Sequence, residues 1–135
     1  MEDYFDAANR HHADAMLLQT QVPPRLANAS HLFGIAAECA VKTVIQNNRS
    51  AAPGVTVMGH INQVHQKFIT CEAVKGKPSF QADMLRAITA FAEWHVSQRY
   101  CNQTDDTFTV ARLVEESEAT AKLLSLRDSW LQRII

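Results

Sequence analysis

The stretch RLANASHLFGIAAECAVKTVIQNN, from Arg25 to Asn48, decides the fold. Its apolar residues cover most of the circumference of a helix; they are Leu26, Ala29, Leu32, Phe33, Ile35, Ala36, Ala37, Ala40, Val41, Val44 and Ile45. A helix that is apolar on nearly every side is normally surrounded by other helices. We therefore expect this segment to be the central helix of a helical domain.

A helix with a single apolar stripe precedes it, from about Glu2 to Thr20. Successive apolar or weakly polar residues follow at steps of four, three, four and three, as on one side of an amphipathic helix: Tyr4, Ala8, His11, Ala15 and Leu18. Pro23-Pro24 then ends the helix, because proline has no amide hydrogen and clashes with the preceding turn. The spacing predicts that this helix packs against the central one.

Three further helices are expected downstream. A shorter one spans about Gly59 to Cys71, with Ile61, Val64, Phe68 and Ile69 on one side. Ser79 is the predicted N-cap of the next, whose stripe is Phe80, Met84, Ile88 and Phe91, and Trp94 to Tyr100 continues that helix or lies just past its end. Asp105 or Asp106 would cap a last helix from about Phe108 to Arg133, with Trp130 near an inward face of Val110, Val114, Ala121, Leu124 and Leu131.

These segments together predict an all-α fold. We expect an antiparallel up-and-down bundle of four main helices plus one shorter helix, forming a single domain over residues 1–135. Only four glycines and four prolines occur, too few for the turns of a many-stranded sandwich or barrel. The one short β-branched stretch, Val55 to Met58, is too isolated to form a sheet.

Charge and cysteine content indicate the class of protein and the compartment in which we expect it. Thirteen basic and fourteen acidic side chains give a formal net charge of -1, which argues against a basic nucleic-acid wrapper or a polybasic membrane binder. Three cysteines, Cys39, Cys71 and Cys101, form no CxxC pair and suggest a reducing compartment. The acidic start differs from a signal peptide, and no apolar run approaches the ~20 residues that span a bilayer. We expect a cytoplasmic protein.

Standard cofactor and metal motifs are absent from the sequence. It contains neither of the two glycine-rich phosphate loops and no HExxH motif. On a helix, His60 and His65 would lie about 140° apart and would not share a metal-binding side. The sequence therefore predicts no cofactor and no metal.

The charged residues of the central helix are the first candidates for a site. Glu38 and Lys42 are spaced i, i+4 in the favourable order, so they could form a solvated pair on an exposed strip. Alternatively, Glu38 faces the interior, where a carboxylate needs a cationic partner. Arg99 is the partner we expect in that case, because guanidinium stays charged when buried and can contact both carboxylate oxygens.

Other polar candidates flank this pair. The segment Trp94-His95-Val96-Ser97-Gln98-Arg99-Tyr100 places an arginine beside two aromatic rings. Arg10 and His11, on the first helix, could join from the other side. The candidate cluster is therefore Arg10, His11, Glu38, Lys42, Trp94, His95, Arg99 and Tyr100.

Several of these residues lie in stretches that resemble a known family. Arg10-His11, Asp14-Ala15 and the run from Ala27 to Lys42 resemble the first two helices of HEPN domains, the higher eukaryotes and prokaryotes nucleotide-binding bundles. Trp94-x-Val96-x-x-Arg99-Tyr100 resembles a segment near the third long helix of small bacterial members. The resemblance implies four or five helices, frequent dimerisation, and a role in RNA cleavage, nucleotide binding or toxin–antitoxin and other defence systems.

The chain departs from the catalytic HEPN pattern at one point. HEPN ribonucleases carry Arg-x4–6-His late in the bundle, whereas no histidine follows His95 here. Arg25-x5-His31 has the spacing but lies between the first two helices. The interpretation we favour is a non-catalytic nucleotide- or RNA-binding or regulatory module, forming a homodimer through the first helix or the Phe80–Trp94 helix. A nucleotidyltransferase-type partner would indicate a toxin–antitoxin pair.

Two alternatives stay open. In a metal-independent endoribonuclease, Arg99 would stabilise phosphate charge while His11, His95 or Tyr100 moves protons. In a structural protein–protein interaction module, the polar cluster would be a buried network that fixes helix register. The two differ in whether Arg99 is open beside a histidine or sealed behind Trp94 against Glu38.

Overall fold

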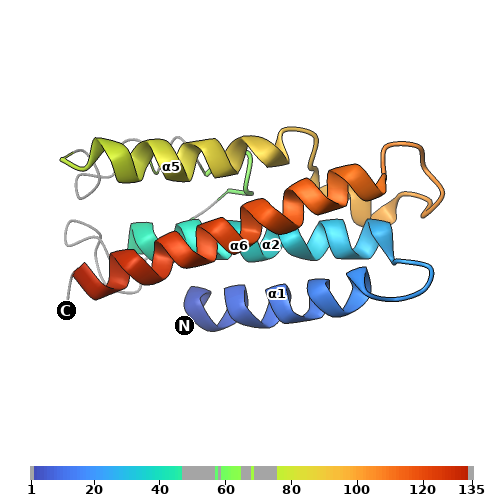
Figure 1. Cartoon of the computed structure of the whole chain (residues 1–135), viewed down its shortest axis with the longest axis horizontal. Coiled ribbons are helices and arrows are strands. Elements are labelled where there is room, and N and C mark those ends of the chain that lie inside the picture. The colour runs from blue at the N-terminus through green and yellow to red at the C-terminus, as the bar shows by residue number, and fades with distance from the viewer. Residues whose placement is uncertain (1, 47–56, 58, 65–67, 69–75, 134–135) are drawn as a thin grey trace.

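The computed structural model describes residues 2–46, 57, 59–64, 68 and 76–133. Its elements, in order, are α1 (Tyr4–Gln19), α2 (Leu26–Gln46), α5 (Pro78–Ile88), η1 (Thr89–Phe91), η2 (Val96–Tyr100) and α6 (Val110–Arg133), where η marks a 3₁₀ helix. The described residues contain four α-helices longer than ten residues and no strand. The all-α prediction is confirmed (Figure 1).

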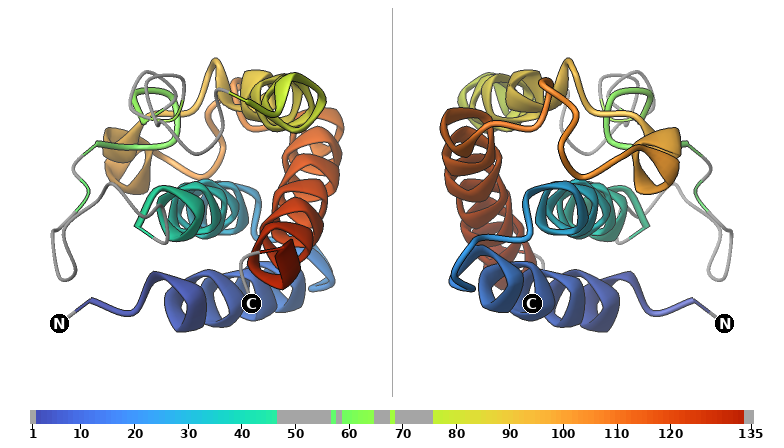
Figure 2. Two further views of the ribbon diagram at one scale, coloured as in Figure 1. Left: turned by 90° about the vertical axis from the view of Figure 1, so that its left-hand side faces the viewer. Right: turned by 90° about the vertical axis from the view of Figure 1, so that its right-hand side faces the viewer.

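The helix α2 lies at the centre of the arrangement. Figure 1 shows α1 and α2 side by side and running in opposite directions, as α5 and α6 also do. Figure 2, which looks along α2, shows α1 below it, α6 on one side and the η2 segment on the opposite side. None of the described helices combines the length and the apolar character that crossing a membrane requires.

Burial confirms the central role of α2. Phe33, Ala36, Ala40, Val41 and Val44 are completely buried, on several sides of the helix. The stripe predicted for α1 also faces α2, with Tyr4, Ala8 and Ala15 buried.

The helix α5 begins earlier than predicted. Its N-cap is Lys77 rather than Ser79, and no side chain caps the helix. Pro78 occupies the first turn, where its fixed φ suits a helix and its missing amide hydrogen costs nothing. The predicted stripe is confirmed, since Phe80, Met84, Ile88 and Phe91 are all buried.

The shorter helix predicted from Gly59 to Cys71 is only partly within the described residues. Gly59 has φ +111, a left-handed conformation outside any helix, and residues 61–64 form a turn. Phe68 is helical, whereas 65–67 and 69–71 lie outside the described residues. The start at Gly59 was therefore wrong, although Ile61, Val64 and Phe68 are fully buried as expected.

A threonine, not an aspartate, caps α6. The Thr109 hydroxyl accepts a hydrogen bond from the Arg112 amide at 3.0 Å. Asp105 instead closes a local turn, because its carboxylate accepts from the amide and hydroxyl of Thr107 at 2.9 and 2.8 Å. The predicted cap at Asp105 or Asp106 was wrong because both residues precede the helix by a further turn.

The inward face of α6 also differs from the prediction. Val110 and Val114 are 59% and 40% exposed, and Ala121 is exposed, while Leu124 and Leu131 are half-buried. The buried face is Leu113, Glu116, Ala119, Thr120, Leu123, Arg127 and Trp130. Apolarity alone gave the wrong register because three of these inward residues are polar.

Each of the three inward polar residues has a partner elsewhere in the fold. The Ser30 hydroxyl donates to Glu116 at 2.6 Å, and the Thr120 hydroxyl donates to the Phe33 carbonyl at 3.2 Å. Arg127 donates to the Asn9 side chain at 2.9 Å and lies 4.1 Å from the Phe5 ring centroid. Pairing offsets the desolvation of these groups, which fixes this register of α6.

The close approach of Trp94 to Gly34 predicts how a Gly34→Ala substitution changes the free energy of unfolding. A Cβ at this position would lie 2.1 Å from Nε1 of Trp94. Alanine favours a helix interior over glycine by about 1 kcal/mol, so propensity alone predicts stabilisation of Gly34→Ala. We expect overpacking to prevail and to lower the free energy of unfolding by about 2–3 kcal/mol.

Chemical denaturation followed by circular dichroism measures this change. Gly76→Ala is the matched control, because nothing lies within 4 Å of a Cβ added there, and it should leave the free energy of unfolding nearly unchanged. A Gly34→Ala variant more stable than the parent would contradict the described position of Trp94.

Candidate functional site

The buried indole of Trp94 organises the candidate site. Its Nε1 donates to the Ser30 carbonyl of α2 at 3.0 Å. The His31 ring stacks on it, with centroids 5.8 Å apart and planes 9° apart, and the His60 ring tilts against it at 5.9 Å. Trp94 therefore fixes two histidines, one from α2 and one from the 59–64 segment, on the same side of the molecule.

Glu38 is buried, but its partner is not the one expected. The Lys42 ammonium lies 2.8 Å from one carboxylate oxygen, and Nδ1 of His60 lies 3.0 Å from the other. The side chains of Glu38 and Lys42 are each 9% exposed, so the pair is neither a solvated surface bridge nor a contact with Arg99. The i, i+4 spacing found the true partner, whereas the expected Arg99 contact was wrong.

Arg99 is exposed because of the geometry of η2. In this 3₁₀ helix it is Gln98 that faces inward and is buried, while Arg99 and Tyr100 face outward. The Arg99 guanidinium lies 4.8 Å from the Tyr100 ring centroid, and Tyr100 is 77% exposed. A cation and an aromatic ring are thus presented together to solvent.

A buried hydrogen-bond network holds η2 in this position. The Gln98 amide nitrogen donates to the Ser30 hydroxyl at 2.8 Å, and Ser30 donates to Glu116 at 2.6 Å. Arg112 bridges the same two residues, donating to the Gln98 oxygen at 2.9 Å and to Glu116 at 3.4 Å. Burial raises the pKa of Glu116, and the Ser30 hydrogen bond and the Arg112 charge oppose that rise.

His31 has a lowered pKa. Burial lowers its pKa, and the charges of Arg99, His11 and His60 lower it further, while Glu38 opposes them. These residues come from α1, α2, the 59–64 segment and η2. We call the set His11, His31, His60, Glu38, Arg10 and Arg99 the histidine face.

Arg10 and His11 join this face from α1. Arg10 is exposed and lies 3.7 Å from the Asp6 carboxylate. Burial lowers the pKa of His11, the charge of Arg10 lowers it further, and the charges of Asp14 and Glu38 raise it. His11 and His31 are therefore predominantly neutral at pH 7, since both pKa values lie below the ordinary value of 6.5.

His95 has a local role. Its Nδ1 accepts from the Ser97 amide at 3.1 Å, which makes it the N-cap of η2. Its own amide donates to the Gln98 side chain at 3.2 Å, which completes a capping box. Nothing in these contacts directs His95 toward the histidine face.

A cleft between α1 and α2 adjoins Glu38 and Lys42. It measures about 440 Å³ and is lined by Glu2, Asp3, Tyr4, Asp6, Ala7, Arg10, Glu38, Cys39 and Lys42. The Lys42 ammonium lies 5.5 Å from the Tyr4 ring centroid. Burial and the hydrogen bond to Glu2 raise the pKa of Tyr4 to about 12, so the phenol is neutral and can donate a hydrogen bond.

The chemistry available on this face is that of cations and neutral imidazoles. Within the described part of the chain, no group of three or more His, Cys, Asp or Glu side chains could hold a metal ion. Arg10 and Arg99 can bind an anionic group, while His11 and His31 can accept a proton at neutral pH.

Comparison with known proteins identifies no relative. No family model, no curated protein and no solved structure matches this chain.

Sequence reasoning missed the four residues that support the site and two of its histidines. Ser30, Gln98, Arg112 and Glu116 form its support, and none was a candidate. Gly34 and Ser30 carried a signal, since both interrupt the most apolar helix, where a small or hydroxyl residue requires a reason. No sequence signal marked His31 and His60, because these two side chains meet Trp94 only in the tertiary fold.

The Glu38–Lys42 pair gives a second prediction. Removing one member of a buried pair leaves the other charge uncompensated. We expect Lys42→Met to lower the free energy of unfolding by about 3 kcal/mol, the low end of the range for such pairs, because His60 still contacts Glu38. A Glu38→Gln/Lys42→Met double variant should lose much less than the sum of the two single losses.

Arg99→Ala is the control for this measurement. Because Arg99 is exposed and does not contact Glu38, it should change the free energy of unfolding by no more than about 0.5 kcal/mol. Urea titration of the four variants at pH 7 measures all of these values. If Arg99→Ala strongly lowered the free energy of unfolding and Lys42→Met did not, the Glu38–Lys42 pair would be contradicted, and Arg99 would be the partner of Glu38.

Proposed function

We propose that this chain is a nucleotide- or RNA-binding module of the HEPN type that binds a phosphate-bearing ligand on its histidine face. The observation that carries the proposal is the exposed pair of Arg99 and Tyr100, whose guanidinium and ring centroid lie 4.8 Å apart; the charge of Arg99 also lowers the pKa of His31. An exposed guanidinium without a carboxylate partner among the described residues is suited to binding phosphate.

The charge of this face supports the same proposal. Lys42 pairs with Glu38 at 2.8 Å and Arg10 pairs with Asp6 at 3.7 Å, which leaves the Arg99 guanidinium without a carboxylate partner among the described residues. A phosphate group would therefore meet one unpaired guanidinium on a chain whose net charge is close to zero.

The exposed Tyr100 ring supports a ligand that carries a base. Single-stranded nucleic acids stack their bases on aromatic side chains and arginine planes. Arg99 already lies against one side of Tyr100, so one stacking surface and one phosphate-binding group occur in adjacent residues.

The wider assignment is also a proposal. The element order is compatible with an antiparallel up-and-down bundle of the HEPN kind, with a shorter fifth helix near Phe68. Cys39 and Cys101 are free thiols, in keeping with a cytoplasmic protein. A role in a toxin–antitoxin or defence system, with a nucleotidyltransferase-type partner, follows from the resemblance alone.

Binding of a labelled RNA tests the proposal. We expect a fluorescein-labelled single-stranded oligoribonucleotide to bind the parent chain and to bind Arg99→Ala at least about tenfold more weakly, because a charge-assisted hydrogen bond is lost. Fluorescence anisotropy measures both affinities, and AMP should compete. Arg86→Ala is the matched control, since Arg86 is also exposed but pairs with Asp83 on α5.

The pH dependence of binding tests the role of the histidines. Because the pKa values of His11 and His31 lie below the ordinary value of about 6.5, both become positively charged only below that pH. Affinity should therefore rise as the pH falls through this region. Equal losses for Arg99→Ala and Arg86→Ala, or the absence of any RNA or AMP binding, would refute the proposal.

A metal-independent endoribonuclease is the second candidate. The specific observation in its favour is that burial lowers the pKa values of both His11 and His31, and that the charge of Arg99 lowers the pKa of His31 further. A neutral imidazole can accept the 2′-hydroxyl proton as the 2′-oxygen attacks the phosphorus, while the guanidinium stabilises the charge that develops on the phosphate. The P–O5′ bond then breaks, and the protonated imidazole can return its proton to the leaving 5′-oxygen.

This activity makes a separate prediction. With EDTA present, the parent chain should cleave single-stranded RNA to products that end in a 2′,3′-cyclic phosphate. His31→Ala and Arg99→Ala should each lower the rate at least about a hundredfold, the usual contribution of one such group. If RNA is bound but remains intact in a gel assay, the chain is a binding module only.

A further inference from the structure

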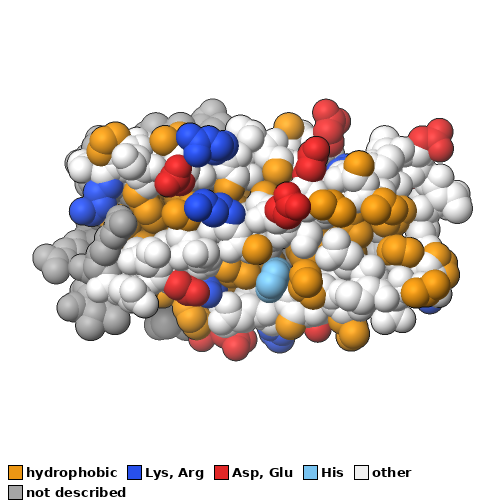
Figure 3. Space-filling view, in the orientation of Figure 1, with side chains coloured by type: hydrophobic (Ala, Val, Ile, Leu, Met, Phe, Trp, Pro, Cys, Tyr) orange, Lys and Arg blue, Asp and Glu red, His pale blue; other side chains and the backbone are white. Residues whose placement is uncertain are grey.

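The loop between η1 and α6 carries Arg99 and Tyr100 and is weakly packed in its second half. We call it the 93–107 loop, and it includes η2. Its residues 101–107 are all exposed. In the space-filling view, the loop extends beyond the hydrophobic side chains that lie over the first half of α6 (Figure 3). The place of the Arg99–Tyr100 pair therefore depends on contacts that the rest of the molecule makes with this loop.

Arg112, in the first turn of α6, contacts the 93–107 loop at three points. Its guanidinium donates to the Glu93 carbonyl at 3.3 Å and to the Thr107 carbonyl at 3.2 Å, at the two ends of the loop. It also donates to the Gln98 side-chain oxygen at 2.9 Å, in the middle of the loop. One side chain thus joins the start, the middle and the end of the loop.

The Arg112 side chain is itself held by two contacts. Its Nε lies 3.4 Å from the carboxylate of Glu116, one turn further along α6, and its guanidinium lies 5.6 Å from the Phe108 ring centroid. The Arg112 side chain is 15% exposed and that of Glu116 is completely buried. The loop therefore meets a fixed set of donors rather than a mobile side chain.

Arginine suits this task better than lysine. The planar guanidinium presents five N–H donors in a fixed arrangement, so it can bind several separate acceptors at once. A lysine at this position would keep the positive charge, but its single nitrogen is a compact donor that cannot replace that arrangement. Substitution by lysine therefore separates the effect of the geometry of Arg112 from the effect of its charge.

We infer that Arg112 is a positioning residue for ligand binding, which holds the 93–107 loop so that Arg99 and Tyr100 lie ready for the ligand. This inference rests on the proposed function. A loop that is ordered before binding loses less conformational entropy when the ligand binds. Arg112 acts through Arg99 and Tyr100 rather than on the ligand, because its own N–H groups already donate to four protein acceptors.

A nitroxide spin label on Cys101 measures the order of the loop without any ligand. Cys101 is exposed and directly follows η2, Cys39 is buried, and a Cys71→Ser background removes the third cysteine of the chain. We expect Arg112→Lys to make the label more mobile, which narrows the lines of its electron paramagnetic resonance spectrum. Circular dichroism should show that the helices are retained.

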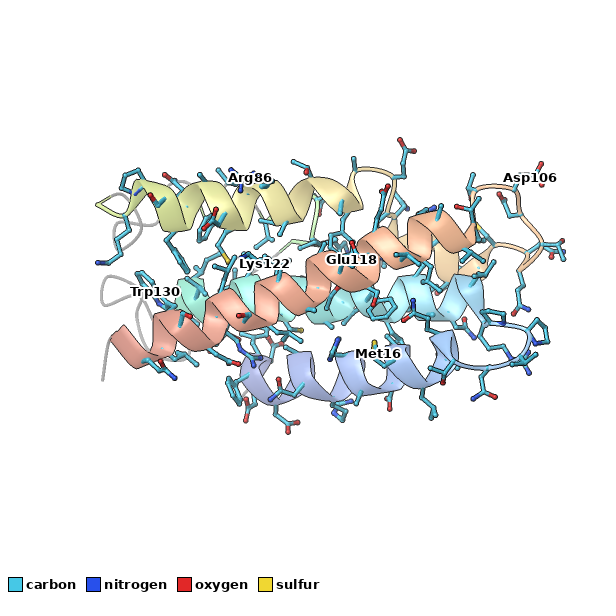
Figure 4. All side chains as sticks on the ribbon, viewed as in Figure 1. Met16, Arg86, Asp106, Glu118, Lys122 and Trp130 are labelled. Atoms are coloured by element: carbon cyan, nitrogen blue, oxygen red, sulfur yellow. The ribbon has the colours of Figure 1, made fainter. Side chains whose placement is uncertain are left out.

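Arg127→Lys is the matched control for both measurements. Arg127 is also a buried arginine of α6, but it contacts Asn9 and Phe5 of α1. It lies three residues before Trp130, toward the opposite end of α6 from the loop around Asp106 (Figure 4). Arg127→Lys should therefore leave the label spectrum and the RNA affinity unchanged, even if it lowers the free energy of unfolding.

The affinity for the fluorescein-labelled oligoribonucleotide tests whether Arg112 acts through Arg99. Arg112→Lys should weaken binding at least about fivefold, although the charge is kept, because the loop must then be ordered on binding. In the Arg99→Ala background, the same substitution should weaken binding by about twofold or less, since the main group that it positions is already gone. Gln98→Met, which removes the middle contact, takes the place of Arg112→Lys if that variant loses its helices.

The possible failures are distinguishable. Equal losses in the two backgrounds, or a label that stays as ordered in Arg112→Lys as in the parent, would overturn the inference. Full RNA affinity in Arg112→Lys together with weak binding by Arg99→Ala would contradict the role of Arg112 alone. A parent chain that binds neither RNA nor AMP would instead contradict the proposed function, and with it the inference.

Discussion

The position of Trp94 is the constraint on which the rest of the structure depends. Its indole lies where any side chain at Gly34 would have to be, and its nitrogen donates to the Ser30 carbonyl one turn earlier on α2. A carbonyl inside a helix already accepts one amide, so the indole uses its second acceptor position. Because the indole occupies this site, the segment from Trp94 to Tyr100 must run beside α2, and it carries Arg99 there. The absence of a side chain at Gly34 thus determines where the exposed Arg99 guanidinium lies.

Two buried carboxylates show different solutions to the same desolvation problem. Glu38 has a lysine at 2.8 Å and a histidine at 3.0 Å, so its charge is compensated locally. Glu116 is completely buried and has a closer neutral donor, the Ser30 hydroxyl, than its cation, Arg112. Burial raises the pKa of Glu116, and the Ser30 hydrogen bond and the Arg112 charge only partly offset that rise. Both carboxylates are bound to α2 residues, which concentrates the polar interactions of the core on the most apolar helix.

The sequence predicted the elements whose stability comes from apolar burial. The two ends of α1, the start of α2 and the stripe of α5 followed from hydrophobic periodicity and proline positions, because those signals are local. The register of α6 could not follow in the same way, since Glu116, Thr120 and Arg127 are inward only because Ser30, Phe33 and Asn9 supply partners from distant parts of the chain. The site also combines local and long-range contacts. The Glu38–Lys42 pair follows from the local i, i+4 spacing, whereas the approach of His31 and His60 to Trp94 depends on the assembled fold.

The two sides of α6 together explain why its inward face could not be predicted from the apolar residues alone. A helix of a solitary domain gains most by burying its valines and exposing its acids. Here Glu116 and Arg127 are buried, while Val110 and Val114 are exposed. Burying the polar residues keeps α6 in a single rotation, because turning the helix would break three separate hydrogen bonds at once. That rotation in turn fixes which side of α6 remains outside, so the buried polar residues determine where the exposed apolar surface lies. The rotation of α6 about its own axis therefore determines both which polar residues are buried in the core and which apolar residues remain exposed.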